Sequence, residues 1–317
     1  MKIDEVARNC RGIRTEVAKA IVEKDAVIEQ LTLAFLAGGH VLFEDYPGLA
    51  KTLMANTFSR TIGCDFKRVQ FTPDLLPADI TGTFVLNRST SQFELRKGPI
   101  FTNVLLADEI NRAPPKTQSA LLEAMQEFQV TLEGETHKLP KPFMVIATQN
   151  PIEYEGTYPL PEAQIDRFLM RLTIGYPSSS GEAEILKRRR TRRTDEVAIS
   201  CVSTPAQILE MQAAVETVHV DDDIEKYIVS IVQETRKHGQ VEVGASPRGS
   251  LALMKLAQAR AALAGRDFVL PDDVKDVAVP ALAHRLILKP DPWIKGIKPK
   301  VIIDKVLATV PVPKARS

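Results

Sequence analysis

The sequence predicts an α/β fold, in which a parallel sheet is followed by a small all-helical domain. Short apolar runs are each followed by polar residues, which is typical of buried parallel strands that hold a ligand at their carboxyl ends. Residues 41–61 combine a strand, a tight loop, Lys-Thr and a helix. Helical periodicity dominates after residue 182, beyond the linker Tyr-Pro-Ser-Ser-Ser-Gly at 176–181. The predicted domains are therefore residues 1–177 and 178–317.

The composition is that of an ordinary globular protein, with 44% hydrophobic and 26% charged residues among 317. The net charge of +1 argues against a positive field over the whole molecule that would attract nucleic acid or an anionic membrane. Cys10, Cys64 and Cys201 form no CxxC pair, so neither a disulfide framework nor a zinc ribbon is indicated. Residues 1–14 lack the apolar core of a signal peptide, and we expect a cytoplasmic protein.

The first elements are two helices in residues 3–36. Apolar residues recur at helical spacing, with a break near Ile21 and Val22, and Asp25 is expected to cap the second helix, which runs through Phe35. His40 follows the glycines that end this helix, and a lone histidine there is more often structural than catalytic. The apolar run 41–43 is the first predicted strand.

The stretch from 41 to 52 has the parts of a phosphate-binding loop. Backbone N–H groups of the loop and of the following helix, 53–61, would hold phosphate oxygens. Lys51 would reach the outer phosphates, and the Thr52 hydroxyl would ligate Mg²⁺. The strict pattern has glycine where this chain has Asp45 and Ala50. An ordinary strand–turn–helix with a solvated lysine is the alternative.

Acids follow the next apolar strand, 103–107, at the edge where a parallel sheet binds ligands. Asp108 would hold Mg²⁺, and Glu109 would orient and deprotonate the attacking water. The alternative is a helix start whose positive dipole end favours acids. A further strand, 144–147, leads to Asn150, whose amide would bond the terminal phosphate or the water. A turn cap is the alternative there.

The remaining elements before the linker are strands and hairpins. Two hairpins are predicted, one pairing 83–86 with 92–96 and the other pairing 129–132 with 136–139. A helix starts at Pro114-Pro115. Two more strands are expected, and residues 72–78 are expected to form a loop; the strands are 67–71 and 168–174.

The second domain is predicted to be helical. The expected helices are 184–193, 204–218, 224–237, 248–263 and 271–285. Residues 187–193 form a basic run, which indicates a solvated helix end more than a nucleic-acid patch, because no aromatic residues interleave it. The tail, 289–317, is Pro-rich with short apolar pieces, and we expect it to pack on the body or on a neighbour.

Several stretches together resemble the MoxR family of AAA+ ATPases. They are GGHVLFEDYPGLAKT, RKGPIFTNVLLADEINRAPPKTQSALLEAMQE, FMVIATQNP, EGTYPLPEAQIDRFLMR and GASPRGS. The resemblance spans residues 20–290 and implies an αβα nucleotide-binding domain with a parallel sheet, followed by a helical lid. Members of the family carry GLAKT, which accommodates Ala50. The two hairpins would face a central pore or a client.

The resemblance also implies roles for single residues. Asp108 and Glu109 match Walker B, Asn150 matches sensor 1, and Arg248 matches sensor 2 and would point at the γ-phosphate. Arg167 resembles the arginine finger, which acts on ATP held by the next subunit, and Arg171 is a weaker candidate. Thr52 and Asp108 would hold Mg²⁺. The nucleotide would contact the Walker A segment and two apolar side chains that line the adenine pocket, namely Pro47, Gly48, Leu49, Ala50, Lys51, Thr52 and Leu53, with Val22 and Ile28.

The family implies a Mg²⁺-dependent ATPase that works as a ring, most often a hexamer. It would remodel or mature partner complexes, and its usual partners are von Willebrand factor A domain proteins, here a separate polypeptide. One alternative is a nucleic-acid motor, which the basic run 187–193 alone favours. Another is a scaffold that uses ATP only to assemble, which the full set of expected catalytic residues disfavours.

Overall fold

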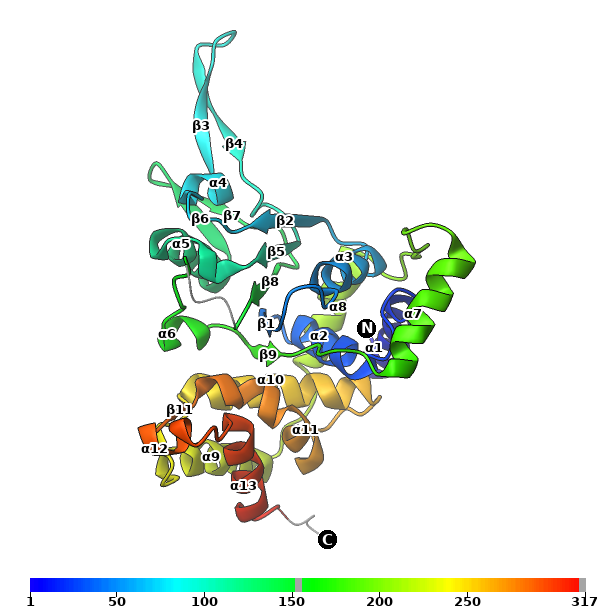
Figure 1. Cartoon of the computed structure of the whole chain (residues 1–317), viewed down its shortest axis with the longest axis vertical. Coiled ribbons are helices and arrows are strands. Elements are labelled where there is room, and N and C mark those ends of the chain that lie inside the picture. Colours follow the sequence, from blue (N-terminus) through cyan, green and yellow to red (C-terminus); the bar gives the residue numbers. More distant parts are fainter. Residues whose placement is uncertain (152–155, 314–317) are drawn as a thin grey trace.

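A parallel sheet with strand order β2–β5–β8–β1–β9 carries the first half of the chain (Figure 1). The structure is a computed structural model and describes residues 1–151 and 156–313. Glu155, which begins one of the recognised motifs, and the last four residues of the tail lie outside the described residues. The strands are β1 (Val41–Glu44), β2 (Phe66–Gln70), β5 (Val104–Asp108), β8 (Met144–Gln149) and β9 (Met170–Leu172).

The parallel sheet confirms the predicted fold class. Its central strands are apolar throughout because both faces are covered. Val41 and Phe43 point into one hydrophobic cluster, whereas Leu42 between them points into the other. The first face is covered by α1 (Ile3–Val17), α2 (Asp25–Leu36) and α3 (Lys51–Thr61). The second face is covered by α5 (Pro115–Glu127) and the short α4 (Pro77–Thr81).

Two antiparallel hairpins extend from this body, as predicted. The longer one joins β3 (Gly82–Asn87) to β4 (Gln92–Lys97) and projects far from the sheet (Figure 1). The other joins β6 (Gln129–Leu132) to β7 (Glu135–Lys138). Short helical segments also flank the sheet; they are η1 (Ile110–Arg112) and α6 (Glu162–Ile165).

The C-terminal half is mainly helical, as predicted. A bundle below the sheet in Figure 1 contains α9 (Asp222–Lys237), α10 (Pro247–Leu263), α11 (Pro271–Leu282) and α13 (Pro299–Thr309). Helix α10 packs against α1 and α2, so the bundle shares one hydrophobic cluster with the sheet's first face. Two further helices, α7 (Ser179–Arg192) and α8 (Pro205–Val215), lie beside the N-terminal helices instead. The predicted domain boundary at residue 177 stays a prediction.

The sequence reading missed several small elements. Helix α4 occupies part of the segment that we expected to be a loop. The Pro-rich tail contains α12 (Pro290–Ile294) and α13, and α13 packs on α9 and α11. A two-stranded ribbon pairs β10 (Val241–Val243) with β11 (Ile287–Leu288), just after η2 (Ala283–Arg285).

Candidate functional site

Three strand ends lie side by side at the carboxyl edge of the sheet. The Asp45 amide, just after β1, donates to the carbonyl of Gln149 at the end of β8 (3.2 Å). The Thr148 hydroxyl, also on β8, donates to Asp108 Oδ1 at the end of β5 (2.6 Å). Lys51 Nζ donates to the Asp45 carbonyl (2.7 Å). The sheet therefore brings the predicted lysine, acid pair and Asn150 to one edge.

The loop between β1 and α3 has the backbone of an anion-binding turn. Gly48 (φ 80°) and Ala50 (φ 57°) both adopt left-handed conformations, and α3 begins at the next residue, Lys51. The N–H groups of the first helical turn lie at the positive end of the helix dipole, which favours negative charge. A left-handed alanine costs about 1 kcal/mol, which the surrounding fold must offset.

Asp45 explains the other departure from the strict loop pattern. Its carboxylate is 5% exposed and accepts hydrogen bonds from the amides of Ile174 and Gly175, just after β9. A glycine could not make these bonds. The start of the loop is therefore tied to the neighbouring edge of the sheet.

A cavity of about 730 Å³ opens beside the loop. The loop lines it with five of the predicted nucleotide-binding residues, namely Pro47, Gly48, Leu49, Ala50 and Leu53. Val22, which we predicted to line an adenine pocket, is also among the lining residues. Ile28 is fully buried in the core and is not among the lining residues. The other walls come from Tyr176 and α7, which the sequence reading did not assign to the site.

The acid pair accepts hydrogen bonds from side chains that the sequence reading missed. Asp108 Oδ2 accepts two hydrogen bonds from the Arg68 guanidinium (2.7 and 3.0 Å). Glu109 Oε2 accepts from Gln70 Nε2 (2.7 Å) and Arg112 Nη1 (3.1 Å). Register places Gln70 directly opposite Asp108, because β2 pairs with β5.

Thr148 links the two acids. Its side chain is fully buried; the hydroxyl donates to Asp108 and accepts a hydrogen bond from the Glu109 amide (2.8 Å). Glu109 has a left-handed backbone (φ 57°), which is unusual for a non-glycine residue and is typical of functional sites. Thr148 therefore fixes both the carboxylate of Asp108 and the strained backbone of Glu109.

The oxygen donors at this edge suit Mg²⁺. The Thr52 hydroxyl and the Asp108 carboxylate are hard ligands, and Mg²⁺ is often held by one or two protein oxygens together with substrate phosphates. Among the described residues, no group of three or more His, Cys, Asp or Glu side chains could hold a metal by itself. The residues thus fit a metal that arrives with a phosphorylated ligand.

Arg167 and Arg248 line a different cavity, of about 480 Å³, which shares no lining residue with the loop cavity. Arg167 donates to the carbonyl of Leu122 (3.0 Å), and an Arg248 nitrogen lies 3.7 Å from Asp166 Oδ2. The structure therefore brings the two arginines together but does not place Arg248 among the residues around the loop. Arg171 pairs with Glu44 at the end of β1 (3.1 Å).

His40 has a structural role, in agreement with the sequence reading. Its Nδ1 accepts from the Val145 amide (2.9 Å), and its Nε2 lies 2.8 Å from the Met125 carbonyl, to which it donates. Burial lowers the pKa of His40 to about 4, so the ring is neutral at physiological pH.

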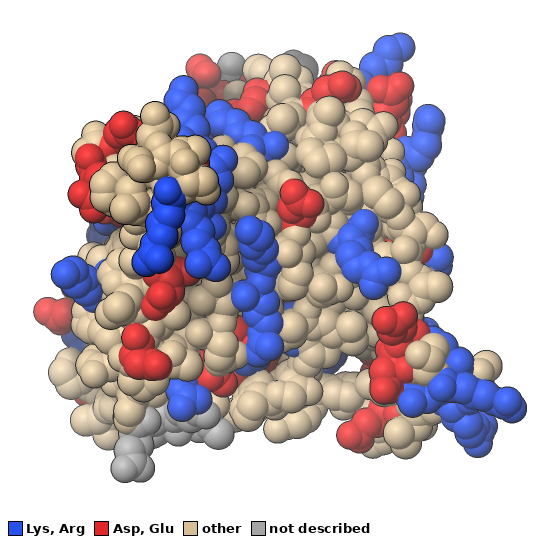
Figure 2. Space-filling model, turned by 90° about the horizontal axis from the view of Figure 1, so that it is seen from above, with Lys and Arg blue, Asp and Glu red and all other residues tan. Residues whose placement is uncertain are grey.

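The basic run lies at the C-terminal end of α7, where positive side chains complement the helix dipole. Seen from above, most of the face is uncharged with positive and negative side chains scattered over it, and positive ones gather on the projecting element at the lower right, where Figure 1 places α7 (Figure 2). Arg188 and Arg189 are paired with Glu184 and Asp195 (2.9 and 2.5 Å). Local partners therefore account for part of this charge.

Comparison with known proteins gives consistent matches. A model of the ATPase family associated with various cellular activities (AAA) matches residues 40–170, and an AAA lid domain model matches residues 233–306. YeaC of Bacillus subtilis (strain 168) is 51% identical over 93% of this chain and 92% of its own length. Chaperone MoxR1 of Mycobacterium tuberculosis (strain ATCC 25618 / H37Rv) is 45% identical over 95% of this chain and 82% of its own. A crystal structure of a candidate ATPase from Cytophaga hutchinsonii ATCC 33406 is 41% identical, with a TM-score of 0.92, and the match covers 98% of this chain and 97% of that one.

Proposed function

The chain belongs to the MoxR family of AAA+ ATPases, and from this premise we propose that it hydrolyses ATP to ADP and phosphate at the carboxyl edge of its sheet. The observation that carries the proposal is that Lys51 and the acid pair Asp108-Glu109 lie at the same edge of the sheet, after β1 and β5 on either side of β8, while the loop before Lys51 lines a cavity. A triphosphate bound there would lie against the N-terminus of α3, where backbone N–H groups favour negative charge.

Each residue has a defined task in this proposal. Lys51 neutralises charge on the outer phosphates, and Asn150 bonds the terminal phosphate or the attacking water. The Glu109 carboxylate, fixed by Gln70 and Arg112, orients that water and takes its proton. Thr52 and Asp108 would hold Mg²⁺, which supplies charge neutralisation when bound.

We further propose that the protein assembles into a hexameric ring, in which Arg167 and Arg248 act on ATP held by the next subunit. Their shared cavity, separate from the loop cavity, supports this arrangement. In this arrangement the γ-phosphate to which Arg248 points is that of the neighbouring subunit's ATP. A site completed by a neighbour makes hydrolysis depend on assembly.

Mixing inactive variants tests this assignment. Arg167→Ala mixed with Lys51→Ala should recover activity, because some interfaces then combine an intact loop with an intact arginine. Arg167→Ala mixed with Arg248→Ala should stay inactive, because every interface lacks one arginine. Recovery in the second mixture would show that Arg248 serves its own subunit.

The proposed output is remodelling or maturation of partner protein complexes, with a von Willebrand factor A domain protein as a separate partner. The projecting β3–β4 hairpin supports a client contact, because Val85, Leu86 and Phe93 are 46%, 48% and 71% exposed. No helix within the described residues is long and apolar enough to cross a membrane. We place the work in the cytoplasm on the strength of the sequence expectation.

A Glu109→Gln variant tests the proposed chemistry. It keeps the size of the side chain and its bonds to Gln70 and Arg112 but removes the base. The wild type should release phosphate from ATP in the presence of Mg²⁺, whereas Glu109→Gln should bind ATP without hydrolysing it. The same variant, used as a trap, should capture the client. Capture of DNA in a salt-dependent manner would favour the nucleic-acid motor instead.

A further inference from the structure

Helix α7 forms one wall of the loop cavity, yet little of the helix is packed against the protein. Gly181 is the only buried residue of α7, all of which lies within the described residues. Ile185 and Leu186 line the cavity and remain 43% and 70% exposed. Burial of apolar surface therefore contributes little to holding α7 in position. Polar contacts near the two ends of the helix must hold it instead.

Glu23 makes the contact at the N-terminal end of α7. Its carboxylate accepts hydrogen bonds from the Ser178 hydroxyl (2.7 and 2.9 Å), the Ser178 amide (3.2 Å) and the Ser180 hydroxyl (3.4 Å). These bonds, from Ser178 above all, lower the pKa of the Glu23 carboxyl. Nearby, Lys24 donates to the carbonyl of Tyr176 (2.9 Å).

The backbone of Glu23 is strained. Its φ of 57° lies in the left-handed region that favours glycine. Asn and Asp tolerate this region because their short side chains hydrogen-bond to the local backbone, which is not a property of Glu. Strain of this kind persists where surrounding structure imposes it, and it clusters at ligand sites. Glu23 follows Val22, which lines the cavity, so the strained residue joins two cavity walls.

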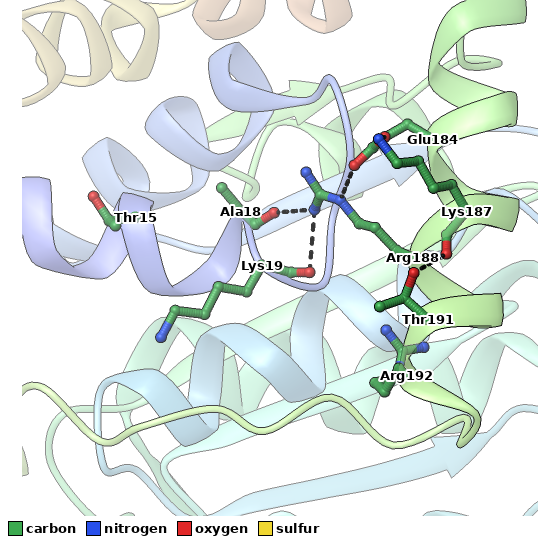
Figure 3. Close-up of a pocket in the computed structure, with 8 residues that line it drawn as sticks. All are labelled: Thr15, Ala18, Lys19, Glu184, Lys187, Arg188, Thr191 and Arg192. Atoms are coloured by element: carbon green, nitrogen blue, oxygen red, sulfur yellow. Dashed lines mark hydrogen bonds and ion pairs between the residues drawn. The ribbon is translucent and has the colours of Figure 1, made fainter.

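The far end of α7 is fastened in a similar way. Arg188 donates to the carbonyls of Ala18 (2.9 Å) and Lys19 (3.2 Å) at the end of α1, as Figure 3 shows. Both ends of the helix are thus tied by side chains to residues 18–24, the segment between α1 and α2.

We propose that Glu23 is a positioning residue for nucleotide binding, because its bonds to Ser178 set the spacing between the Val22 and α7 walls that enclose the base of a nucleoside triphosphate. This inference rests on the proposed function, which places the nucleotide in this cavity. The phosphates bind at the loop, on the other side of the ligand. Loosening α7 therefore weakens the hold on the base and leaves the hold on the phosphates intact.

A Glu23→Gly variant separates these effects. Glycine relieves the left-handed backbone and removes the bonds to Ser178, so the fold keeps its thermal stability while α7 loosens. If α7 then occupies the binding position a tenth of the time, ATP binds about tenfold more weakly. Inorganic tripolyphosphate, which lacks a base, should bind as in the wild type. Glu23→Gln, whose amide oxygen still accepts hydrogen bonds, should retain most of the ATP affinity of the wild type.

Gly181→Ala provides an independent route to the same loss. A Cβ at Gly181 would lie 2.2 Å from Glu23 Oε2, so the flexible carboxylate must move away from Ser178. Alanine also favours the helix, so stability should not fall. In the Glu23→Gly background the same substitution should have no further effect, because the group it displaces is gone.

Isothermal titration calorimetry measures the affinities for ATP and for tripolyphosphate, with Glu109→Gln present in every protein to prevent hydrolysis. Weaker ATP binding with unchanged tripolyphosphate binding in Glu23→Gly supports the inference. Unchanged ATP affinity, or an equal loss for both ligands, would overturn it. Glu196→Asn, an exposed acid beyond α7, is the matched control and should change neither affinity. A parent protein that binds neither ligand would refute the proposed function itself.

Discussion

Thr148→Val removes one hydroxyl group at the centre of the acid pair and keeps the shape of the side chain. Thr148 is fully buried, so water cannot replace the lost partner. The substitution breaks the 2.6 Å bond to the Asp108 carboxylate, worth about 1.5–3 kcal/mol, and orphans the Glu109 amide, which costs about 1–3 kcal/mol. We expect a fall of roughly 3–5 kcal/mol in the free energy of unfolding.

Catalysis should fall as well, because the Glu109 carboxylate loses its fixed position. A displacement of about 1 Å can cost on the order of 10²-fold in rate, so we expect kcat to drop about 100-fold while the KM for ATP changes little. Phosphate release, scaled to the folded fraction from circular dichroism, gives kcat. Thr148→Ser is the control; it keeps the hydroxyl and should lose only about 1 kcal/mol of stability. Equal kcat values for the Val and Ser variants would refute the reasoning.

Further predictions concern other parts of the molecule. His40 has a pKa of about 4 in the folded protein and an ordinary value in the unfolded chain, so the unfolded chain binds an extra proton as pH falls. About 3 kcal/mol of stability should therefore be lost between pH 6.5 and 4. In urea unfolding, the free energy of unfolding of His40→Gln should depend less on pH over this range. Arg68 competes for Asp108, so Arg68→Ala should lower the Mg²⁺ concentration for half-maximal phosphate release, and a rise would show that Arg68 holds the carboxylate in place. Phe58 is fully buried, and its ring lies edge-on to that of Phe35 with the ring centroids 5.5 Å apart. Phe58→Ala should therefore lower the free energy of unfolding, measured in urea, by about 3–5 kcal/mol. A loss smaller than that for a single methylene group would contradict the packing role of Phe58.

Much of the fold follows from local sequence. The apolar run ending at Asp108 is a buried strand, and the carboxyl ends of parallel strands meet at one edge, so the lysine and the acid pair could be placed together. The hairpins followed from strand patterns separated by turns. Helix α13 also carries a helical pattern, with Ile302, Ile303 and Val306 buried, but we predicted no helix in this Pro-rich tail.

The missed contacts depend on tertiary pairing. Arg68 and Gln70 reach the acid pair only because β2 pairs with β5, which lies next to it in the sheet but later in the chain. Strand order is not encoded in local periodicity. In the same way, Arg248 lies beside Asp166 although 82 residues separate them in the chain, and this depends on the packing of α10 against α1 and α2, which a motif match cannot reveal.

The central claim is most directly tested by a structure of Glu109→Gln with ATP and Mg²⁺. We predict that the triphosphate lies across the ends of β1, β5 and β8, with Lys51 on its outer phosphates and the base between Val22 and α7. A nucleotide bound elsewhere, with these strand ends free of phosphate, would contradict the account.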